Sequence, residues 1–381
     1  MTDGRNDLEI GYNVPAAIGD RVEDIQTPAL IVDLAAFERN VERMRGYVES
    51  MNVRLRAHAK THKSADIARY QMAKGGACGV CCQKVSEAEA LVRGGISDVL
   101  VSNEVTGPLK IKRLARLAKD ARIIVCVDDA ANIAALSAAA QDAGSTIEVL
   151  VEIDCGARRC GVQPGGPVLG LARVAAAAPN LVFSGLQAYH GTAQHIVDPA
   201  ERSAEIALAV DMTRDTVQLL KQHGLDCAIV GGAGTGSFDM EGSSGVYNEL
   251  QCGSYVFMDA HYGRVRGDNG VVGGFEHALF VLTSIMSKTE ATRAVCDAGH
   301  KAVAVDSGPP VVFGRPGITY LVANDEHGKI DDPGNLLAIN DLLWLVPGHC
   351  DPTSNLHDWF VGIRNGKVET LWPVTARGKL Y

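Results

Sequence analysis

Short apolar segments alternate with amphipathic segments along the first two thirds of the chain. Each apolar segment is rich in Val, Ile and Leu and ends in a polar residue, which is typical of strands buried on both faces of a sheet. The stretches between them, such as 35–50, 85–95, 128–144 and 198–223, have the spacing of amphipathic helices. The eight apolar segments are 28–34, 54–60, 79–82, 98–103, 122–128, 147–154, 181–189 and 227–232.

Eight successive strand–helix units predict an α/β fold with a parallel sheet. This number favours a closed (β/α)8 barrel of the TIM type over an open doubly wound sheet. After about residue 262 the pattern changes to strand-like segments separated by turns, and Asn365-Gly366 is a hairpin signal. We therefore expect the barrel over residues 27–261 and a mainly β domain formed by 1–26 and 262–381.

Composition excludes several classes of protein. Among the 381 residues, 36 Lys and Arg stand against 45 Asp and Glu, which gives a formal net charge of −9. An acidic chain without a basic run is a poor partner for nucleic acid or an anionic membrane. No apolar run approaches the roughly 18 residues of a membrane span. The polar, acidic N-terminal segment lacks the apolar core of a signal peptide, so we expect a cytoplasmic protein.

The ten cysteines are expected to be free thiols, because a long chain without a secretion signal seldom carries a disulfide framework. Cys78 and Cys81 form a lone C-x-x-C inside an apolar run, with no second pair to complete a structural zinc site. We interpret them as small buried side chains.

Chemically useful residues follow several of the predicted strands, where barrel active sites form. Lys60 ends the segment 54–60; away from water its pKa is expected to fall, which would make its amine nucleophilic, and the alternative is a surface charge. The glycine-rich segment 231–237 follows the last apolar segment and suits a phosphate, although a turn without a ligand remains the alternative. Together they predict pyridoxal phosphate (PLP) or a phosphorylated aldehyde as the ligand.

A possible metal site lies near the C-terminus. In an extended chain, side chains two residues apart point the same way, so His349 and Asp351 could bind one ion. Imidazole and carboxylate ligands suit Mg²⁺, Mn²⁺ or Zn²⁺. A turn that Asp351 stabilises before Pro352 is the alternative.

Five motifs carry a resemblance to a known family, and they occur along nearly the whole chain. They are T-P-A-L-I-V-D-L (27–34), R-A-H-A-K-T-H-K (56–63), D-C-G-A-R-R-C-G-V (154–162), N-E-L-Q-C-G-S-Y (248–255) and V-P-G-H-C-D-P-T (346–353). The chain resembles the D-threonine aldolase family of fold-type III PLP enzymes, and within it the 3-hydroxy-D-aspartate aldolase branch. The resemblance implies an alanine-racemase-like barrel with a C-terminal β domain.

The resemblance also implies roles for individual residues. Lys60 matches the lysine that binds PLP covalently, Arg159 the arginine that faces the pyridine nitrogen, and Gln83 a residue near the cofactor. Tyr189 and His195 match active-site groups. The phosphate cradle matches Gly234, Thr235, Gly236, Gly253 and Ser254, and the ligands of a divalent metal match His349 and Asp351. The visible departure is Ala233, where related sequences often have a third consecutive glycine, and we expect a minor adjustment of the loop there.

The implied reaction is a reversible retro-aldol cleavage of D-3-hydroxy amino acids. D-Threonine would give glycine and acetaldehyde, and 3-hydroxy-D-aspartate would give glycine and glyoxylate. The metal would bind the 3-hydroxyl, and His195 or a metal-bound water would take its proton. The resemblance also implies a homodimer.

Three alternatives remain open at this point. A D-serine or 3-hydroxyaspartate dehydratase of the same fold usually binds metal through H-x-C, whereas this chain has His349 and Asp351. An amino-acid racemase would not need the metal pair. A non-catalytic PLP-binding protein would be a shorter, single-domain barrel. We therefore expect an aldolase, with the dehydratase as the main alternative.

Overall fold

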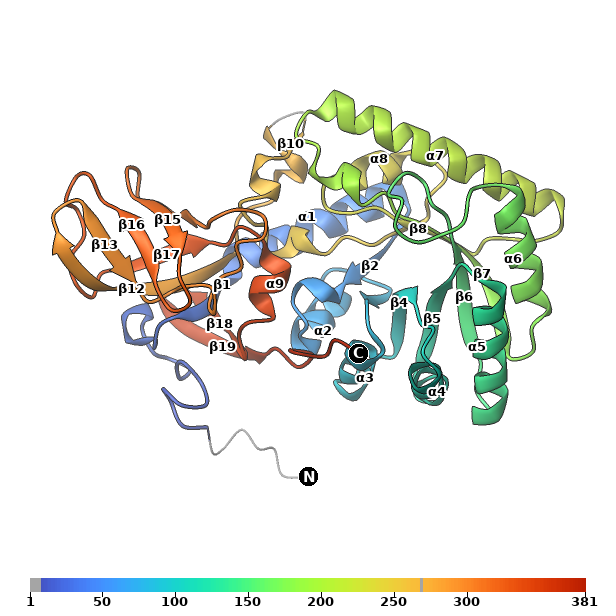
Figure 1. Ribbon diagram of the computed structural model, residues 1–381, viewed down its shortest axis with the longest axis horizontal. Coiled ribbons are helices and arrows are strands. Elements are labelled where there is room, and N and C mark those ends of the chain that lie inside the picture. The colour runs from blue at the N-terminus through green and yellow to red at the C-terminus, as the bar shows by residue number, and fades with distance from the viewer. Residues whose placement is uncertain (1–7, 268–269) are drawn as a thin grey trace.

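A parallel barrel and a separate, mostly antiparallel sheet form the two lobes of the protein, and the short helix α9 (Cys350–Ser354) lies between them (Figure 1). The structure is a computed structural model that describes residues 8–267 and 270–381. Residues 1–7 of the predicted N-terminal segment 1–26 lie outside the described residues. Within the described parts of the chain, every helix is too short or too polar to cross a membrane.

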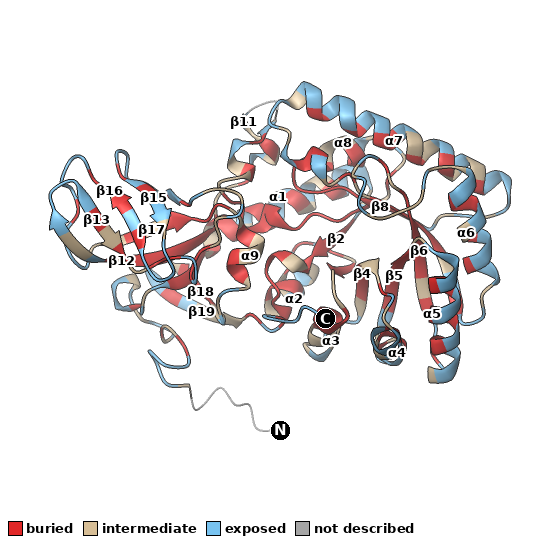
Figure 2. Cartoon of the chain, viewed as in Figure 1, coloured by how far each residue is buried: buried red, intermediate tan, exposed pale blue. Residues whose placement is uncertain are grey.

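The barrel closes with eight parallel strands, which confirms the predicted fold class. Its centre is filled by a small apolar cluster that includes Cys81, Leu100, Ile124 and Leu150, and the strands are buried along most of their length (Figure 2). The strands are β2 (Arg54–His58), β3 (Gly79–Cys82), β4 (Asp98–Glu104), β5 (Arg122–Val127), β6 (Ile147–Glu152), β7 (Leu181–Ala188), β8 (Ile229–Gly232) and β9 (Glu249–Leu250).

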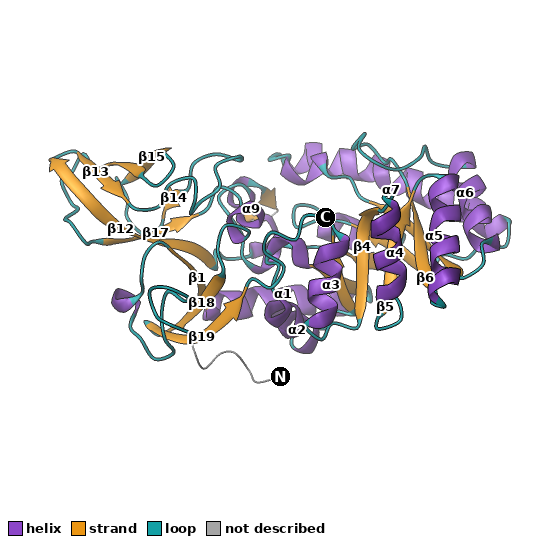
Figure 3. Cartoon of the chain, turned by 60° about the horizontal axis from the view of Figure 1, so that its bottom comes forward, coloured by secondary structure: helices purple, strands orange, loops and turns teal. Residues whose placement is uncertain are grey.

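Helices cover the outside of the barrel, as the view in Figure 3 makes plain. Local capping fixes where they begin: the Asp33 carboxylate accepts hydrogen bonds from the first backbone amides of α1, and Asp198 caps α7, whose first residue is Pro199. The helices are α1 (Leu34–Met51), α2 (Ala65–Ala73), α3 (Val85–Arg93), α4 (Pro108–Leu117), α5 (Ala130–Ala143), α6 (Gly166–Ala177), α7 (Pro199–Gln222) and α8 (Phe238–Ser243).

The second lobe is a nine-stranded sheet in the order β15-β16-β13-β12-β1-β18-β19, with β14 and β17 joined to it through β12. Asn365 and Gly366 both have positive φ and connect β18 to β19, which confirms the predicted hairpin. The strands are β1 (Ala29–Asp33), β12 (Leu279–Glu290), β13 (Arg293–Cys296), β14 (Val311–Val312), β15 (Thr319–Ala323), β16 (Gly328–Asp331), β17 (Leu342–Val346), β18 (Trp359–Arg364) and β19 (Lys367–Pro373).

The apolar segment 28–34 is not a barrel strand, contrary to the prediction. As β1 it pairs antiparallel with β12 and parallel with β18 in the nine-stranded sheet. It is buried on both faces there, so its apolar pattern is the same as that of a barrel strand. The missing barrel strand is β9, where Glu249 binds Arg56 at 2.7 Å inside the barrel. Such a short, polar strand has no apolar run by which it could be predicted. The domain boundaries 27–261 and 262–381 stay a prediction.

The described part of the N-terminal segment contacts the sheet of the second lobe. The amide of Gly19 donates to the carbonyl of Val368 at 2.8 Å. Ala16 and Ile25 belong to an apolar cluster that also contains Phe280 of β12. The free cysteines were predicted correctly, since all ten thiols are unpaired.

Candidate active site

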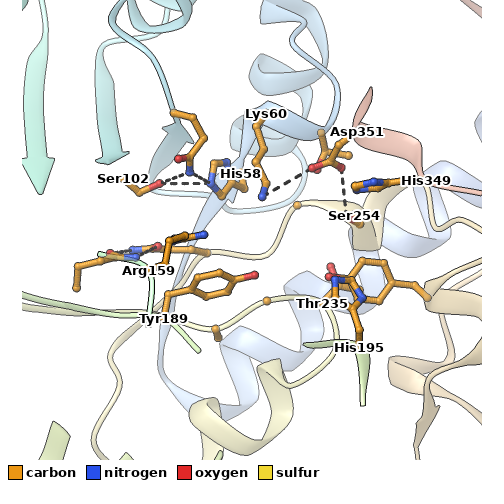
Figure 4. Close-up of a pocket in the computed structure, with 18 residues that line it drawn as sticks. His58, Lys60, Ser102, Arg159, Tyr189, His195, Thr235, Ser254, His349 and Asp351 are labelled. Carbon is orange, nitrogen blue, oxygen red and sulfur yellow. Dashed lines mark hydrogen bonds and ion pairs between the residues drawn. The ribbon is translucent and has the colours of Figure 1, made fainter. Parts of the chain in front are cut away.

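A cavity of about 280 Å³ opens at the carboxyl ends of the barrel strands. Loops of the barrel form most of its wall, and the segment that begins α9 forms the rest. Figure 4 shows polar side chains from both lobes pointing into it. The residues that line it are His58, Lys60, Thr61, Gln83, Ser102, Arg159, Gln187, Tyr189, His195, Ala233, Gly234, Thr235, Gln251, Gly253, Ser254, Tyr262, His349 and Asp351.

Lys60 lies in the single turn of helix (Ala59–Thr61) that follows β2, with its amine inside the cavity (Figure 4). The Nζ atom is 3.8 Å from Oδ2 of Asp351. Burial lowers the pKa of Lys60, but the Asp351 carboxylate and Tyr189 outweigh it, so the pKa lies above its ordinary value. The predicted fall in the pKa is therefore wrong for the protein without ligands, because an acidic neighbour compensates for the loss of water.

Gly234 and Gly253 keep the opposite wall of the cavity free of side-chain atoms. A Cβ atom at Gly234 would collide with the side chain of Gln194, and one at Gly253 with the hydroxyl of Thr61. Gly236 does not line the cavity: its amide donates to Oε1 of Gln194 at 3.1 Å and so fixes the loop from behind. Bare backbone therefore lines the cavity at Gly234 and Gly253, and Gly236 supports the loop.

Two hydroxyl groups complete this wall. The Thr235 oxygen accepts a hydrogen bond from the Tyr255 amide at 2.9 Å, which leaves its own hydrogen available to a ligand. Ser254 donates to Oδ1 of Asp351 at 3.4 Å. Bare backbone and hydroxyl donors of this kind form a cradle for a phosphate.

A buried chain of hydrogen bonds behind the cradle was not predicted. Gln194 donates to the Ser237 hydroxyl at 2.7 Å, and Ser237 donates to Oε1 of Glu241 at 2.9 Å. Burial raises the pKa of Glu241 to about 8, so this carboxyl is neutral at neutral pH. Ser237 ends the predicted glycine-rich segment, whereas Gln194 and Glu241 do not stand at the end of an apolar segment, so the rule that locates barrel sites does not find these two.

Gln83, Ser102 and His58 form one side of the cavity at the ends of β2, β3 and β4. The Gln83 amide donates to Nε2 of His58 at 2.9 Å and to the Ser102 hydroxyl at 3.0 Å. Burial holds the pKa of His58 well below its ordinary value, so the ring is neutral and accepts this hydrogen bond. Gln83 therefore lies on the cavity wall together with His58 and Ser102, and its contact with a cofactor stays a prediction.

Arg159 and Tyr189 lie next to each other, with the guanidinium carbon 5.6 Å from the centre of the Tyr189 ring. Oε1 of Glu152 is 4.0 Å from Nη2 of Arg159. Burial and the neighbouring Glu104 raise the pKa of Glu152 to about 8. Ligand atoms of Glu104, Glu152 and Cys160 lie within 4.8 Å of one another, and this is the one group of three possible metal ligands among the described residues.

His195 reaches the cavity from the helical turn Thr192–His195 that follows β7. Its ring stacks on that of His261, with 4.1 Å between centroids and 14° between planes. Burial, together with the nearby rings of His261 and His349, lowers the pKa of His195 to about 4. The ring is neutral at neutral pH and can accept a proton.

His349 and Asp351 enter the cavity from the start of α9. His349 has an extended backbone, whereas Asp351 lies in the first helical turn, so the helix start and not an extended chain brings them together. The predicted extended geometry is therefore wrong for this pair. The Asp259 carboxylate accepts from the amide of Cys350 at 2.9 Å and holds the turn on the barrel. Burial raises the pKa of Asp351, but Lys60 and His349 outweigh it and lower the pKa overall.

The cavity fits both groups that the resemblance implies. The Lys60 amine and the bare backbone at Gly234 and Gly253 line one cavity, which fits a phosphate cofactor held covalently by the lysine, and a side chain at either glycine would collide with neighbouring side chains. His349 and Asp351 offer one imidazole nitrogen and one carboxylate, a donor set that suits Mg²⁺, Mn²⁺ or Zn²⁺ with further positions left for water or substrate.

Comparisons with known proteins agree with this arrangement. The family described as "Alanine racemase, N-terminal domain" matches residues 32–261, and the "Putative serine dehydratase domain" matches 278–363. A 3-hydroxy-D-aspartate aldolase from Paracoccus denitrificans (strain Pd 1222) is 54% identical over 98% of this chain and 97% of its own. A D-threonine aldolase from Arthrobacter sp. is 46% identical, with 96% of each chain covered. The chain belongs to the D-threonine aldolase family.

A solved member of the D-threonine aldolase family has nearly the same fold. The crystal structure of D-threonine aldolase from Filomicrobium marinum has a TM-score of 0.94 and 52% identity over 97% of this chain and 100% of that chain. The two family models match different lobes, with residues 32–261 covering the barrel and residues 278–363 covering most of the sheet lobe and α9.

Proposed function

We propose that the protein is a lyase that uses PLP and a divalent metal to cleave D-3-hydroxy amino acids reversibly into glycine and an aldehyde. The observation that carries the proposal is a single cavity that contains the Lys60 amine, the bare glycine cradle and the His349–Asp351 pair. The relatives named for 3-hydroxy-D-aspartate and D-threonine support it, because they match along almost the whole chain. The proposed products are glyoxylate or acetaldehyde, each with glycine.

The barrel side of the cavity would hold the cofactor. Lys60 would bind PLP through its amine, Arg159 would face the ring nitrogen, and Gln83 would contact the cofactor from the wall of β3. The phosphate would lie in the cradle of Gly234, Thr235, Gly253 and Ser254, with Gly236 supporting the loop through Gln194. When bound, PLP accepts the electron pair left by the broken Cα–Cβ bond. The planar guanidinium of Arg159 would orient the ring through an N–H directed at its nitrogen.

The α9 side would hold the metal and the proton acceptor. A divalent ion on His349 and Asp351 supplies a Lewis acid for the substrate 3-hydroxyl. His195 lies on the same side of the cavity as His349 (Figure 4). Its ring is neutral, because its pKa is lowered to about 4, and it would act as a weak base that takes the hydroxyl proton once the metal has made that hydroxyl more acidic. The Tyr189 hydroxyl points toward the middle of the cavity (Figure 4), where it would position the substrate or cofactor.

Product analysis separates this proposal from the dehydratase. The dehydratase is the second candidate because part of the chain matches a putative serine dehydratase domain. It would release ammonia and a keto acid. We expect D-threonine and 3-hydroxy-D-aspartate to yield glycine in amounts equal to the aldehyde, with no ammonia and with loss of activity in EDTA. Ammonia in place of glycine would overturn the aldolase and support the dehydratase.

We further propose a cytoplasmic homodimer. The ten free cysteines support the location, because disulfides are rare in reducing compartments. Apolar residues exposed on the sheet lobe, among them Val311, Phe313 and Leu321, support an interface with a second copy. Light scattering should give twice the mass of the 40.3 kDa chain, and a monomer at micromolar concentration would contradict the dimer.

A further inference from the structure

His349 makes a second contact outside the cavity, which the proposed reaction does not use. Its Nδ1 atom is 2.8 Å from Oδ2 of Asp306, in the connection between β13 and β14. Because the two ring nitrogens lie on different edges of imidazole, a hydrogen bond at Nδ1 leaves Nε2 as the nitrogen for the cavity. Asp306 itself does not line the cavity. It therefore contacts the metal pair from behind.

The connection that carries Asp306 is tied to α9 at a second point. The Thr353 hydroxyl accepts from the amide of Ala304 at 3.2 Å and donates to the carbonyl of His349 at 2.8 Å. Ser307 donates to the same Oδ2 atom of Asp306 at 3.1 Å. These bonds fix the carboxylate relative to the His349 ring, although the Asp306 side chain is about half exposed (53%).

We propose that Asp306 is the positioning residue of the metal site, and that it fixes the tautomer and orientation of His349 through the Nδ1 hydrogen bond. A carboxylate on the far nitrogen of a metal-binding histidine also makes the near nitrogen a stronger ligand, and loss of such a partner typically lowers metal affinity about 10- to 100-fold. The inference rests on the proposed function only in that His349 and Asp351 bind the metal.

The test is the Mn²⁺ dissociation constant of the PLP-loaded protein after its metal has been removed with EDTA. Free Mn²⁺ is measured by electron paramagnetic resonance during titration. We expect Asp306→Asn and Asp306→Ala to raise the dissociation constant about 10- to 100-fold. Cofactor absorbance and melting temperature should stay at wild-type values. Activity lost at limiting Mn²⁺ should return when Mn²⁺ is in excess.

Two further variants control the experiment. Asp325→Asn removes an exposed carboxylate from the turn between β15 and β16 and should leave the dissociation constant unchanged. Ser307→Ala removes only the second donor to Asp306 and should have a smaller effect than Asp306→Asn. Equal Mn²⁺ affinity in wild type and Asp306→Asn would overturn the inference, as would a loss of affinity matched by a fall in melting temperature. Failure of the proposed function looks different, because the wild type itself would then bind no Mn²⁺.

Discussion

The two sides of the cavity are built in different ways. On the barrel side, bare backbone at Gly234 and Gly253 forms the wall, and the positions are fixed by strands that are buried on both faces. On the α9 side, the side chains of His349 and Asp351 project from the start of the five-residue helix α9. The carboxylates of Asp306 and Asp259 hold that turn in place through hydrogen bonds with the His349 ring and the Cys350 amide. The barrel side therefore depends on shape, whereas the α9 side depends on a few replaceable polar contacts.

This difference predicts how each side responds to change. A larger residue at Gly234 or Gly253 on the barrel side would collide with its neighbours, so we expect a steric effect that weakens cofactor binding. A contact removed on the α9 side weakens a ligand gradually and leaves the barrel intact. The two sides should be separable by experiment, with cofactor absorbance reporting on one and metal affinity on the other.

The largest expected effect is that of Lys60→Ala. Lys60 has the amine that lies inside the cavity, so its loss should remove the visible absorbance of lysine-bound PLP and abolish cleavage. Lys74→Ala, which removes an exposed lysine, is the matched control and should behave as wild type. Lys63 is unsuitable as a control because it forms a buried ion pair with Glu87 at 2.7 Å. Retention of both absorbance and activity in Lys60→Ala would contradict the proposed cofactor site.

Removal of the metal should affect only the α9 side. We expect EDTA treatment, or His349→Ala, to lower kcat/KM by about 100-fold or more, since a Lewis acid contributes several kcal/mol. The visible absorbance of the cofactor should stay, because Lys60 and the cradle do not depend on the ion. Activity of the treated wild type should return with Mn²⁺, whereas His349→Ala should remain impaired. If the cofactor absorbance disappeared when the metal was removed, the proposed independence of cofactor binding from metal binding would be refuted.

Gly253→Ala should weaken cofactor binding without touching the metal pair. The new methyl group would meet the Thr61 hydroxyl and the His58 carbonyl, and overpacking of this kind costs about 1–3 kcal/mol. We expect the dissociation constant of PLP to rise roughly 10- to 100-fold, as measured by titration of the apoprotein with PLP.

Gly170→Ala is the matched control for this substitution. Gly170 lies in α6, its Cβ would meet no atom within 4 Å, and alanine there should stabilise the helix by about 0.5–1 kcal/mol. Cofactor affinity should not change. If Gly253→Ala bound PLP as tightly as Gly170→Ala does, the cradle would not be the phosphate site.

The sequence predicts the barrel side of the site better than the α9 side. Strand-end positions lead directly to Lys60, Gln83 and Tyr189, because apolar periodicity locates the strands. The prediction that His349 and Asp351 are metal ligands depends on the family resemblance, because an H-x-D motif is common and has no distinctive periodicity. Asp306 and Glu241 could not be predicted, because their partners come from segments that only the tertiary structure brings together.

The exchange of β1 for β9 has a related cause. The segment 28–34 has the apolar pattern of a strand buried on both faces. This pattern indicates burial, but it does not indicate which sheet the strand belongs to. The segment around Glu249 is polar because its carboxylate pairs with Arg56 inside the barrel. Local patterns therefore find seven of the eight barrel strands, assign the segment 28–34 to the wrong sheet and miss β9.

Burial keeps the Glu241 carboxyl on the barrel side neutral, whereas Lys60 and His349 favour the charged form of Asp351 on the α9 side. The neutral Glu241 makes the free energy of unfolding depend on pH. Glu241, behind the cradle, has its pKa raised from 4.5 to about 8, so the folded protein holds a proton that the unfolded chain releases. Between these values the folded state binds more protons, and stability falls as the pH rises. We expect the stability contributed by Glu241 to decrease from pH 5 to pH 8, so the melting temperature of the wild type should decrease relative to that of Glu241→Gln over this range. Glu326→Gln, at an exposed carboxylate paired with Lys301, should keep the wild-type slope. An unchanged slope in Glu241→Gln would contradict the neutral state of Glu241.

Ala233 should give the smallest effect, and it tests how far the barrel side depends on backbone shape. The residue stands where related sequences often have glycine, and its φ of 67° lies in the left-handed region, which costs a non-glycine residue roughly 1–2 kcal/mol. Glycine would remove this strain but would lose about 0.4–1 kcal/mol through the greater freedom of the unfolded chain. Ala233→Gly should therefore raise the free energy of unfolding by no more than about 1 kcal/mol, measured by thermal or urea denaturation. The same exchange at Ala134, an exposed helical position in α5, should lower it by about 0.5–1 kcal/mol. Equal destabilisation at both positions would mean that the loop carries no strain at Ala233.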